Sequence, residues 1–292
     1  MRVEVLDARP LRFADGAPVR AASGIARHGP GWLVVQDDAT HAAAWDGTTC
    51  RPVRLLPPVE GLEVFDEESG TKELKPDLEA AVALPDGTVL ALGSGSTPAR
   101  TRVVLLRAGG PVVHELADLY ARVTDALGVP ADQLNLEGAC VLGETLRWFQ
   151  RGLPSAGAPT ASVDVPLAGL LAGVGDGPVS GVRRYDLGST DGVGLAVTDA
   201  VTLADGRVLV SAAAEDSPTT YDDGPVVGSA LALLDQDRVV ASTPLPGLAG
   251  GVAKVEGLEL VEEHRSALEL VAVVDADDPR RPSLLLRLWV TL

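Results

Sequence analysis

The stretch DLEAAVALPDGTVLAL, residues 77–92, contains an acidic residue and two apolar runs separated by a glycine-containing turn. The same arrangement recurs along the chain, and an internal repeat of this length decides the fold. Three further copies are NLEGACVLGETLRWF (135–149), VTDAVTLADGRVLVS (197–211) and VEGLELVEEHRSALELVAV (255–273). A fifth and weaker copy, SGIARHGPGWLVV (23–35), has a serine in place of the acid.

One position of the repeat is occupied by this serine and by four acids, at intervals of 56 to 62 residues. These residues are Ser23, Glu79, Glu137, Asp199 and Glu256. Each unit reads as four strands, because Asp86-Gly87 and Asp205-Gly206 separate alternating apolar runs where a hairpin turn requires positive φ. Radially repeated four-stranded meanders are propeller blades, whereas solenoid repeats are usually shorter and need capped ends. We therefore predict an all-β fold, with residues 1–292 forming a single five-bladed β-propeller.

The two ends of the chain are expected to meet in one blade. The last repeat lacks its outer strand, and MRVEVLDA at residues 1–8 is a strand that belongs to no repeat. Pairing of residues 1–8 with residues 283–290 would close the ring and remove both open sheet edges. A helical pattern at residues 115–128 ends at Gly128 with Pro130 beyond it, and predicts a helical insertion between the second and third blades.

Composition narrows the partners that the protein can have. Of 292 residues, 46% are hydrophobic but only 3% aromatic, which predicts a core of Val, Leu and Ala. The formal charge of −17 repels phosphate backbones and anionic membranes, so neither nucleic acid nor a membrane is an expected partner. Clustered carboxylates favour a divalent cation instead, although most surface acids serve solubility.

Other sequence signals are negative. The first residues contain no basic segment followed by an apolar run, and no stretch approaches the roughly 18 to 20 apolar residues of a membrane span, which predicts a cytoplasmic protein. Cys50 and Cys140 match neither a disulfide framework nor a zinc spacing, and are expected to be buried small side chains. The four histidines fall at turns or outer strands, and no nucleophile elbow, HExxH motif or Walker loop occurs.

The repeated position lies at the start of the innermost strand of each predicted blade, so its residues should form a ring around the axis. Four carboxylates there, Glu79, Glu137, Asp199 and Glu256, raise one another's pKa unless a cation compensates them. With Ser23 they form a set of oxygen ligands that suits Ca²⁺, whose coordination is flexible. Alternatively, some of these acids accept hydrogen bonds from backbone N–H groups of a neighbouring blade.

The second strand of each blade returns to the same face, so the residues at its end should surround the mouth of the channel. They are Asp37 and Asp38, Ser94 and Ser96, Gln150 and Arg151, Glu215 and Asp216, and Asp275 and Asp277. Three loops at this face, starting at Gly93, Phe149 and Ala212, are rich in polar residues and glycine and differ from one another. We expect a ligand in such loops.

Individual mouth residues suggest roles for a small-molecule substrate. Ser94 and Ser96 next to Arg100 and Arg102 are candidates to bind a phosphate or carboxylate, or the arginines are ordinary surface residues. Arg151 beside Trp148-Phe149 is a better candidate for an inward-facing cation.

The remaining polar residues of this face are assigned more simply. Lys75 and Lys254 precede ring acids and are expected to neutralise them. Glu215 is a candidate general base or a supporting acid. Tyr221, Asp222 and Asp223 are expected to structure their own loop through side-chain hydrogen bonds.

The segment Lys254-Val255-Glu256-Gly257-Leu258-Glu259 and the other ring residues resemble two groups of propellers. One is the calcium-activated nucleotidases, or apyrases, five-bladed proteins in which a serine and several acids hold a central Ca²⁺; Ser23, Glu79, Glu137 and Glu256 match that pattern, and Asp199 occupies a matching repeat position. The other is the esterase-like phytase family, which carries similar Glu-Gly-Leu segments. The chain is also similar to bacterial propellers that share the E-D-S…Y-D-D-G stretch.

Two functions follow. The first is a Ca²⁺-dependent hydrolase of a small phosphorylated or ester substrate, in which Arg151 or Arg100 binds negative charge and Glu215 or a ring carboxylate activates water. In this interpretation Ser94, Ser96, Gln150, Asp275 and Lys75 contact the substrate. The second is a propeller without catalytic activity, whose central ion is structural and whose rim binds a ligand or a protein.

Overall fold

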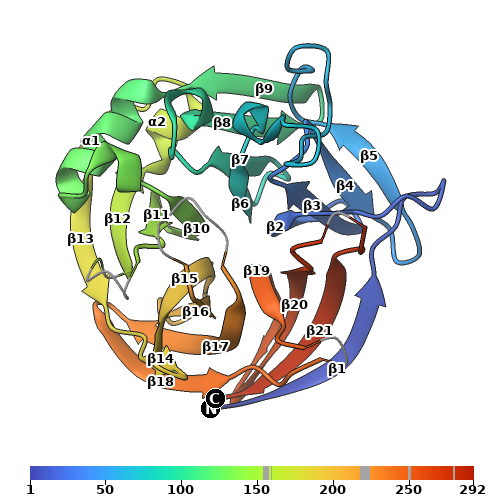
Figure 1. Ribbon diagram of the computed structural model, residues 1–292. Helices are drawn as coiled ribbons and strands as arrows, with labels where there is room; N and C mark the ends of the chain where they lie inside the picture. Colours follow the sequence, from blue (N-terminus) through green and yellow to red (C-terminus); the bar gives the residue numbers. More distant parts are fainter. Residues whose placement is uncertain (154–157, 159, 218–223, 249–250, 279) are drawn as a thin grey trace.

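In a computed structural model of the protein, the chain forms a ring of antiparallel sheets around a central axis (Figure 1). The structure describes residues 1–153, 158, 160–217, 224–248, 251–278 and 280–292. Within these residues there are five sheets, which confirms the predicted five-bladed propeller. The blades follow one another along the chain, and each inner strand packs against the inner strands of its neighbours.

The strands of each blade follow one another from the axis outward. Blade 1 contains β2 (Ala22–His28), β3 (Gly31–Gln36), β4 (His41–Trp45) and β5 (Cys50–Arg54). Blade 2 contains β6 (Leu78–Ala83), β7 (Val89–Gly93), β8 (Arg102–Arg107) and β9 (Gly110–Glu115). Blade 3 contains β10 (Leu136–Leu142), β11 (Thr145–Gln150), β12 (Thr160–Pro166) and β13 (Ser180–Tyr185). Blade 4 contains β15 (Val193–Thr202), β16 (Val208–Glu215), β17 (Val226–Asp235) and β18 (Arg238–Pro244), with the short β14 (Ser189–Thr190) paired to β15. Blade 5 contains β19 (Lys254–His264), β20 (Ala267–Asp275), β21 (Leu284–Thr291) and β1 (Arg2–Pro10).

The predicted Asp-Gly turns connect the first two strands of blades 2 and 4. Gly87 and Gly206 have φ of +83° and +86°, in the left-handed region that glycine adopts readily. The carboxylate of Asp86 accepts a hydrogen bond from the N–H of Thr88 at 2.9 Å, which stabilises the reversal. Turn chemistry and apolar alternation together therefore fix where these hairpins lie.

Blade 5 is closed by the first strand of the chain, as predicted. β1 pairs antiparallel with β21, in a register that runs from Arg2 opposite Thr291 to Pro10 opposite Leu284. The two chain ends consequently lie side by side in one sheet (Figure 1). The last sheet then has no missing outer strand.

The predicted helical insertion is α1 (Ala117–Leu127), which lies between blades 2 and 3 and ends at Gly128 with φ +67°. Its Tyr120 hydroxyl donates a hydrogen bond to the carbonyl of Gly93 at 2.8 Å, and its ring packs edge-on against Trp148. The second helix is α2 (Leu167–Leu171), and short 3-10 turns cover Lys72–Leu74, Pro98–Arg100 and Ala131–Gln133. Of the residues described, no helix has the length and apolar character needed to cross a membrane.

Small residues allow the inner strands to approach one another closely at the axis. A Cβ added to Gly24 would lie 2.9 Å from the backbone of Ala81, one at Gly138 would lie 2.7 Å from Cα of Asp199, and one at Gly257 would lie 2.9 Å from Cα of Gly24. No side chain fits in these contacts without moving backbone. Glycine is therefore required where the blades meet.

The two cysteines are buried and free, as expected for small core side chains. Burial raises the pKa of each thiol to about 12. A thiol that stays protonated is a poor nucleophile and a poor metal ligand. Neither cysteine is therefore a candidate nucleophile or metal ligand.

Candidate functional site

A β-bulge interrupts the innermost strand of every blade at the same point. The ladder between the first two strands skips the bulged residue, for example between Ala22 and Gly24 in blade 1 and between Val255 and Gly257 in blade 5. The residues in the bulges are Ser23, Glu79, Glu137, Thr198 and Glu256. In blade 3 the bulge also includes Gly138. A bulge redirects a side chain, and here it marks the ring position.

The ring residue of blade 4 is thus Thr198, and the prediction that Asp199 belongs to the ring is wrong by one residue. Because side chains alternate along a strand, this slip places Asp199 on a different side from the ring. Its carboxylate accepts backbone hydrogen bonds from Leu258 at 2.7 Å and from Ala139 at 3.4 Å, on the two flanking blades. The alternative of backbone hydrogen bonding therefore applies to this acid. Burial raises its pKa well above the ordinary value, although these N–H groups lower it.

The two hydroxyl members of the ring are each bonded to the next blade. Ser23 Oγ donates to the carbonyl of Leu78 at 2.5 Å, and Thr198 Oγ1 donates to the carbonyl of Val255 at 2.6 Å. Each of these carbonyls directly precedes a ring glutamate. The ring therefore has two hydroxyls, which join blades, and three glutamates.

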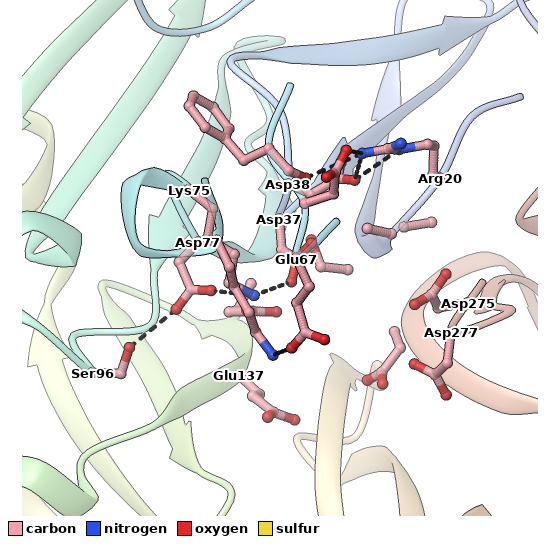
Figure 2. A pocket seen from close by; sticks show the side chains of 18 of the residues that line it. Arg20, Asp37, Asp38, Glu67, Lys75, Asp77, Ser96, Glu137, Asp275 and Asp277 are labelled. Carbon is pink, nitrogen blue, oxygen red and sulfur yellow. Dashed lines mark hydrogen bonds and ion pairs between the residues drawn. The ribbon is translucent and has the colours of Figure 1, made fainter. Parts of the chain in front are cut away.

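The ring opens into a cavity of about 570 Å³ at one face of the propeller. The side chains that line it include twelve acidic and six basic residues. Figure 2 shows that they come from different sides, with Asp37, Lys75 and Asp77 facing Asp275 and Asp277 across the open space. The acids are Asp37, Asp38, Asp66, Glu67, Glu68, Asp77, Glu79, Glu137, Glu256, Asp275, Asp277 and Asp278, and the bases are Arg20, Lys72, Lys75, Arg100, Arg151 and Lys254.

Glu137 is the ring acid with an unusual set of contacts. It is 6% exposed, and its Oε1 accepts hydrogen bonds from Asn135 Nδ2 at 2.9 Å and from Arg151 Nη1 at 3.0 Å. Its Oε2 is buried and has no partner among the described residues. Burial raises the pKa of Glu137 to about 8, although Arg151 lowers it. A buried carboxylate oxygen without a donor is costly unless it carries a proton or contacts a cation.

Glu215 connects blades 3 and 5. Its Oε2 contacts Arg151 Nη2 at 2.6 Å and Lys254 Nζ at 3.5 Å, while its Oε1 accepts the N–H of Gly224 at 2.8 Å. Burial raises its pKa, but the two cations offset this and the pKa is lowered. Because both oxygens are occupied and the proton affinity is reduced, the geometry argues against the predicted role of Glu215 as a general base. Lys254 also contacts Glu256 at 3.0 Å, as expected for a neutralising lysine.

Asp77 organises the blade 2 side of the cavity. Lys75 Nζ lies 2.7 Å from its Oδ1, and Arg100 Nη1 donates to its Oδ2 at 3.0 Å. The hydroxyls of Ser94 and Ser96 also donate to Oδ2. Burial raises the pKa of Asp77, but Lys75 and Arg100 lower it to about 2. Asp77 adopts φ +57°, a conformation that a non-glycine residue rarely keeps without such support.

These contacts correct several predicted substrate roles. Ser94 and Arg100 are buried and bonded to Asp77, rather than free to bind an anion. Gln150 is also buried. Its side-chain amide accepts a hydrogen bond from the N–H of Asn135 and donates one to the carbonyl of Gln133. Lys75 joins Asp77 to Asp37, 2.5 Å away.

Other mouth residues do reach the cavity. Ser96 and Asp275 line it, and their contact with a substrate stays a prediction. Tyr221, Asp222 and Asp223 lie outside the described residues.

The residues two positions before the ring glutamates complete the site; Lys254 was predicted to neutralise its acid, whereas the roles of Asp77 and Asn135 were missed. Asp77, Asn135 and Lys254 precede Glu79, Glu137 and Glu256 in D-x-E, N-x-E and K-x-E segments. Both Asn135 and Lys254 contact the glutamate that follows them. A polar residue two positions before each repeated acid is a signal that the sequence contains.

The fit of a metal ion differs between two parts of the cavity. Oxygens of Asp37, Asp77 and Glu79 lie within 4.8 Å of one another. However, Lys75 already bridges Asp37 and Asp77, and four side chains donate to Asp77 or contact it. Glu137 offers a cation an oxygen with no partner in the described part of the chain. In that part of the chain, Glu137 and Glu256 belong to no group of three converging acids.

Comparison with known proteins identifies a family. The family of unknown function DUF6910 matches residues 71–279, and the chain therefore belongs to it. No curated protein matches the sequence.

Solved structures share the fold. A mannose phosphorylase from Leishmania mexicana in complex with phosphate has a TM-score of 0.51 at 12% identity, over 97% of this chain and 88% of that one. A hypothetical protein from Leishmania major has a TM-score of 0.50 at 11% identity, over 99% and 91%. A GH43 β-1,3-galactosidase has a TM-score of 0.51 at 9% identity, over 96% and 58%. At such identities the similarity shows the propeller fold alone, and the resemblance to apyrases and phytases stays a prediction.

Proposed function

We propose that this protein binds one Ca²⁺ at the axis of the propeller and hydrolyses a small ester at the mouth of the cavity. The observation that carries the proposal is Glu137 Oε2, a buried carboxylate oxygen at the ring with no partner among the described residues. A cation would remove the cost of leaving this oxygen unpaired. It would also offset the effect of burial, which raises the pKa of both Glu137 and Glu256.

Charge balance at the axis supports a divalent ion. The three ring glutamates and Glu215 carry four negative charges when ionised. Arg151 and Lys254 contact Glu137, Glu215 and Glu256 and contribute two positive charges. A divalent cation would therefore neutralise this group of side chains.

The donor chemistry favours Ca²⁺ over softer metals. Glu137 and Glu256 would hold the ion, with the lone pairs of the Ser23 hydroxyl as a further oxygen donor. Hard oxygen ligands without histidine or cysteine are typical of Ca²⁺ and Mg²⁺, and Ca²⁺ tolerates irregular geometry better. When bound, such an ion would polarise the carbonyl oxygen of an ester.

Glu79 suits the role of general base better than Glu215. Neither of its oxygens has a hydrogen bond or ion pair among the described residues, and it lines the cavity. Burial and the charges of Asp77 and Asp37 raise its pKa well above the ordinary value. In its ionised form, a carboxylate with raised proton affinity accepts a proton from water more readily than the paired Glu215.

An ester is a better substrate than a phosphorylated molecule. The prediction that Arg100 or Arg151 binds negative charge requires a free guanidinium. Arg100 contacts Asp77, and Arg151 contacts both Glu137 and Glu215. Neither arginine is available to a substrate anion without breaking a buried ion pair, which is unfavourable.

Calcium titration calorimetry tests the metal site. The wild-type protein is expected to bind one Ca²⁺, and Glu137→Gln is expected to weaken binding by about tenfold or more, since a charged ligand is lost. Thermal melting without metal should show that the variant still folds. A flat titration at millimolar Ca²⁺ would refute the site and the hydrolase built on it.

A panel of 4-nitrophenyl esters and lactones, measured with Ca²⁺ and with chelator, tests the activity. Calcium-dependent turnover that Glu79→Gln reduces by about a hundredfold or more would support the proposed base. If Ca²⁺ binds but no ester or lactone is hydrolysed, the ion is structural and the propeller is a binding protein.

A further inference from the structure

A cluster of potential metal ligands lies at the hairpin between β19 and β20, away from the cavity. One ligand atom from each of Glu262, His264 and Glu269 lies within 4.8 Å of the other two. Glu262 is six residues after the ring acid Glu256 on the same strand, β19. Since a strand rises about 3.4 Å per residue, the cluster lies about 20 Å from the ring. It is therefore separate from the proposed calcium site.

The strand register brings these three side chains to one face of the sheet. Glu262 and Glu269 are directly opposite each other in the pairing of β19 with β20. His264 is two residues after Glu262, and it shares that face because side chains alternate along a strand. Like charges directly opposite each other destabilise a sheet. Glu269 is paired with Arg287, whereas the ion-pair partner of Glu262 in the described ranges is His264 alone, at 3.8 Å.

The imidazole of His264 provides an independent observation. Its Nε2 is buried and has no hydrogen-bond partner in the described part of the chain. Its Nδ1 lies 3.8 Å from Glu262 Oε1, which is too far for a hydrogen bond. The ring is nevertheless held by packing, because its centroid lies 5.0 Å from that of the Trp289 ring. A neutral imidazole in this position keeps a nitrogen lone pair that a metal ion can use.

The chemistry of the donors favours a transition metal over Ca²⁺. One imidazole nitrogen and two glutamate carboxylates are ligands that Zn²⁺ binds in proteins. Imidazole suits Zn²⁺ and its neighbours in the transition series, whereas Ca²⁺ takes oxygen ligands. A divalent ion would also offset the repulsion between Glu262 and Glu269. Three protein ligands would leave the fourth tetrahedral position to water.

We propose that Glu262, His264 and Glu269 form a second metal site, which binds Zn²⁺ and joins β19 to β20 at their hairpin. The site depends neither on the proposed hydrolase activity nor on calcium at the axis. Trp289 lies on the adjacent strand β21 (Figure 1) and would keep the imidazole oriented toward the ion. Zinc would therefore stabilise the blade that β1 closes.

Zinc titration calorimetry of the full chain, without an affinity tag and with Ca²⁺ in excess, tests the site. We expect one Zn²⁺ to bind, and His264→Ala to weaken binding by at least about tenfold, since even residues that only orient a ligand contribute about 10- to 100-fold. The matched control is His28→Ala, because His28 ends the inner strand of blade 1 as His264 ends that of blade 5. An equal loss in both variants, or no saturable binding by about 1 mM Zn²⁺, would overturn the proposal.

Variants at neighbouring glutamates locate the ion on one face of the hairpin. Glu262→Gln should weaken zinc binding by at least about tenfold, as expected for the loss of a charged ligand. Its control is Glu263→Gln, which removes the same charge from the next residue. The carboxylate of Glu263 accepts the N–H of Ala204 on blade 4, so this variant should bind zinc as the wild type does. Wild-type affinity in Glu262→Gln would show that the ion is held elsewhere and that the proposal is wrong.

Two single variants separate this site from the axis. Glu137→Gln should weaken Ca²⁺ binding and leave Zn²⁺ binding unchanged, and His264→Ala should do the reverse. NMR of the imidazole nitrogens should show a shift at His264 when Zn²⁺ is added. If zinc binding is lost in Glu137→Gln but kept in His264→Ala, zinc occupies the axis and the second site does not exist. A wild-type protein that binds zinc at His264 but no calcium would refute the proposed function and leave this site standing.

Discussion

Glu137 and Asp199 are buried acids on neighbouring inner strands, and their surroundings differ in one respect. Asp199 has a backbone N–H donor for each oxygen, at 2.7 and 3.4 Å, and no contact with the cavity. Glu137 has two donors on one oxygen and none among the described residues on the other. Burial raises the pKa of both. Burial and a raised pKa are therefore common to both acids, and only the oxygen without a donor distinguishes Glu137.

The largest expected effect comes from removing the acid that holds the blades together. Asp199→Ala leaves the N–H groups of Ala139 and Leu258 without an acceptor, and each buried unsatisfied donor costs about 1 to 3 kcal/mol. The free energy of unfolding should therefore fall by about 2 to 6 kcal/mol in urea denaturation. Glu137→Gln should change it far less. A loss below about 1 kcal/mol for Asp199→Ala would show that its hydrogen bonds are not structural.

Stabilisation by calcium should depend on Glu137 and not on Asp199, the reverse of the effect on the metal-free fold. At a free ion concentration near 100 times its dissociation constant, Ca²⁺ is expected to stabilise the fold by about 2.7 kcal/mol. This increment should persist in Asp199→Asn and fall to about 1.4 kcal/mol or less in Glu137→Gln at the same ion concentration, because only Glu137 is a proposed ligand of the ion. Thermal melts with calcium and with chelator measure it. An equal increment in both variants would mean that the ion binds elsewhere.

A smaller effect is expected from the residue that makes Glu137 different. Asn135 and Arg151 both donate to Oε1, so Asn135→Ala should let the carboxylate turn and lower Ca²⁺ affinity by about fivefold. This is only part of the roughly 1.5 to 3 kcal/mol of a hydrogen bond to a charged group, because Arg151 still holds the carboxylate. The control is Gln36→Ala in blade 1, since Gln36 is a buried amide that bonds only backbone. Calorimetry should show unchanged calcium affinity in the control, and an equal loss in both would contradict the role of Asn135.

A separate effect concerns pH. The carboxyl of Asp275 has an ordinary pKa of 3.8 that rises to about 8 in the folded protein, so its contribution to stability is complete below about pH 4 and is lost as pH rises to about 8. The metal-free protein should therefore unfold at a lower urea concentration at pH 9 than at pH 6. Asp275→Asn should reduce this slope, because an amide does not ionise. A slope that is unchanged in the variant would assign it to other acids such as Asp199.

The sequence predicts local features of the fold better than contacts between blades. The Asp-Gly hairpins, the helix before Gly128 and the pairing of β1 with β21 depend on turn chemistry and on counting strands, both of which can be read along the chain. The predicted ring residue of blade 4 was wrong because Thr198 and Asp199 are adjacent, and only the bulge decides which of them faces the ring. Arg151 contacts Glu137 of its own blade and Glu215, which lies 64 residues away on blade 4, and no local pattern indicates the second pair.

The pairing of β1 with β21 also has a consequence for biosynthesis. Blade 5 combines the strand of the propeller that is translated first with the three that are translated last, so its sheet stays incomplete until residue 291 has left the ribosome. Blades 1 to 4 are contiguous and can assemble during translation, as units near the N-terminus generally do. Until then strand β1 has an unpaired edge, exposed to neighbouring nascent chains and to chaperones. Closure of the ring, and with it the shape of the cavity, therefore follows the synthesis of all five blades.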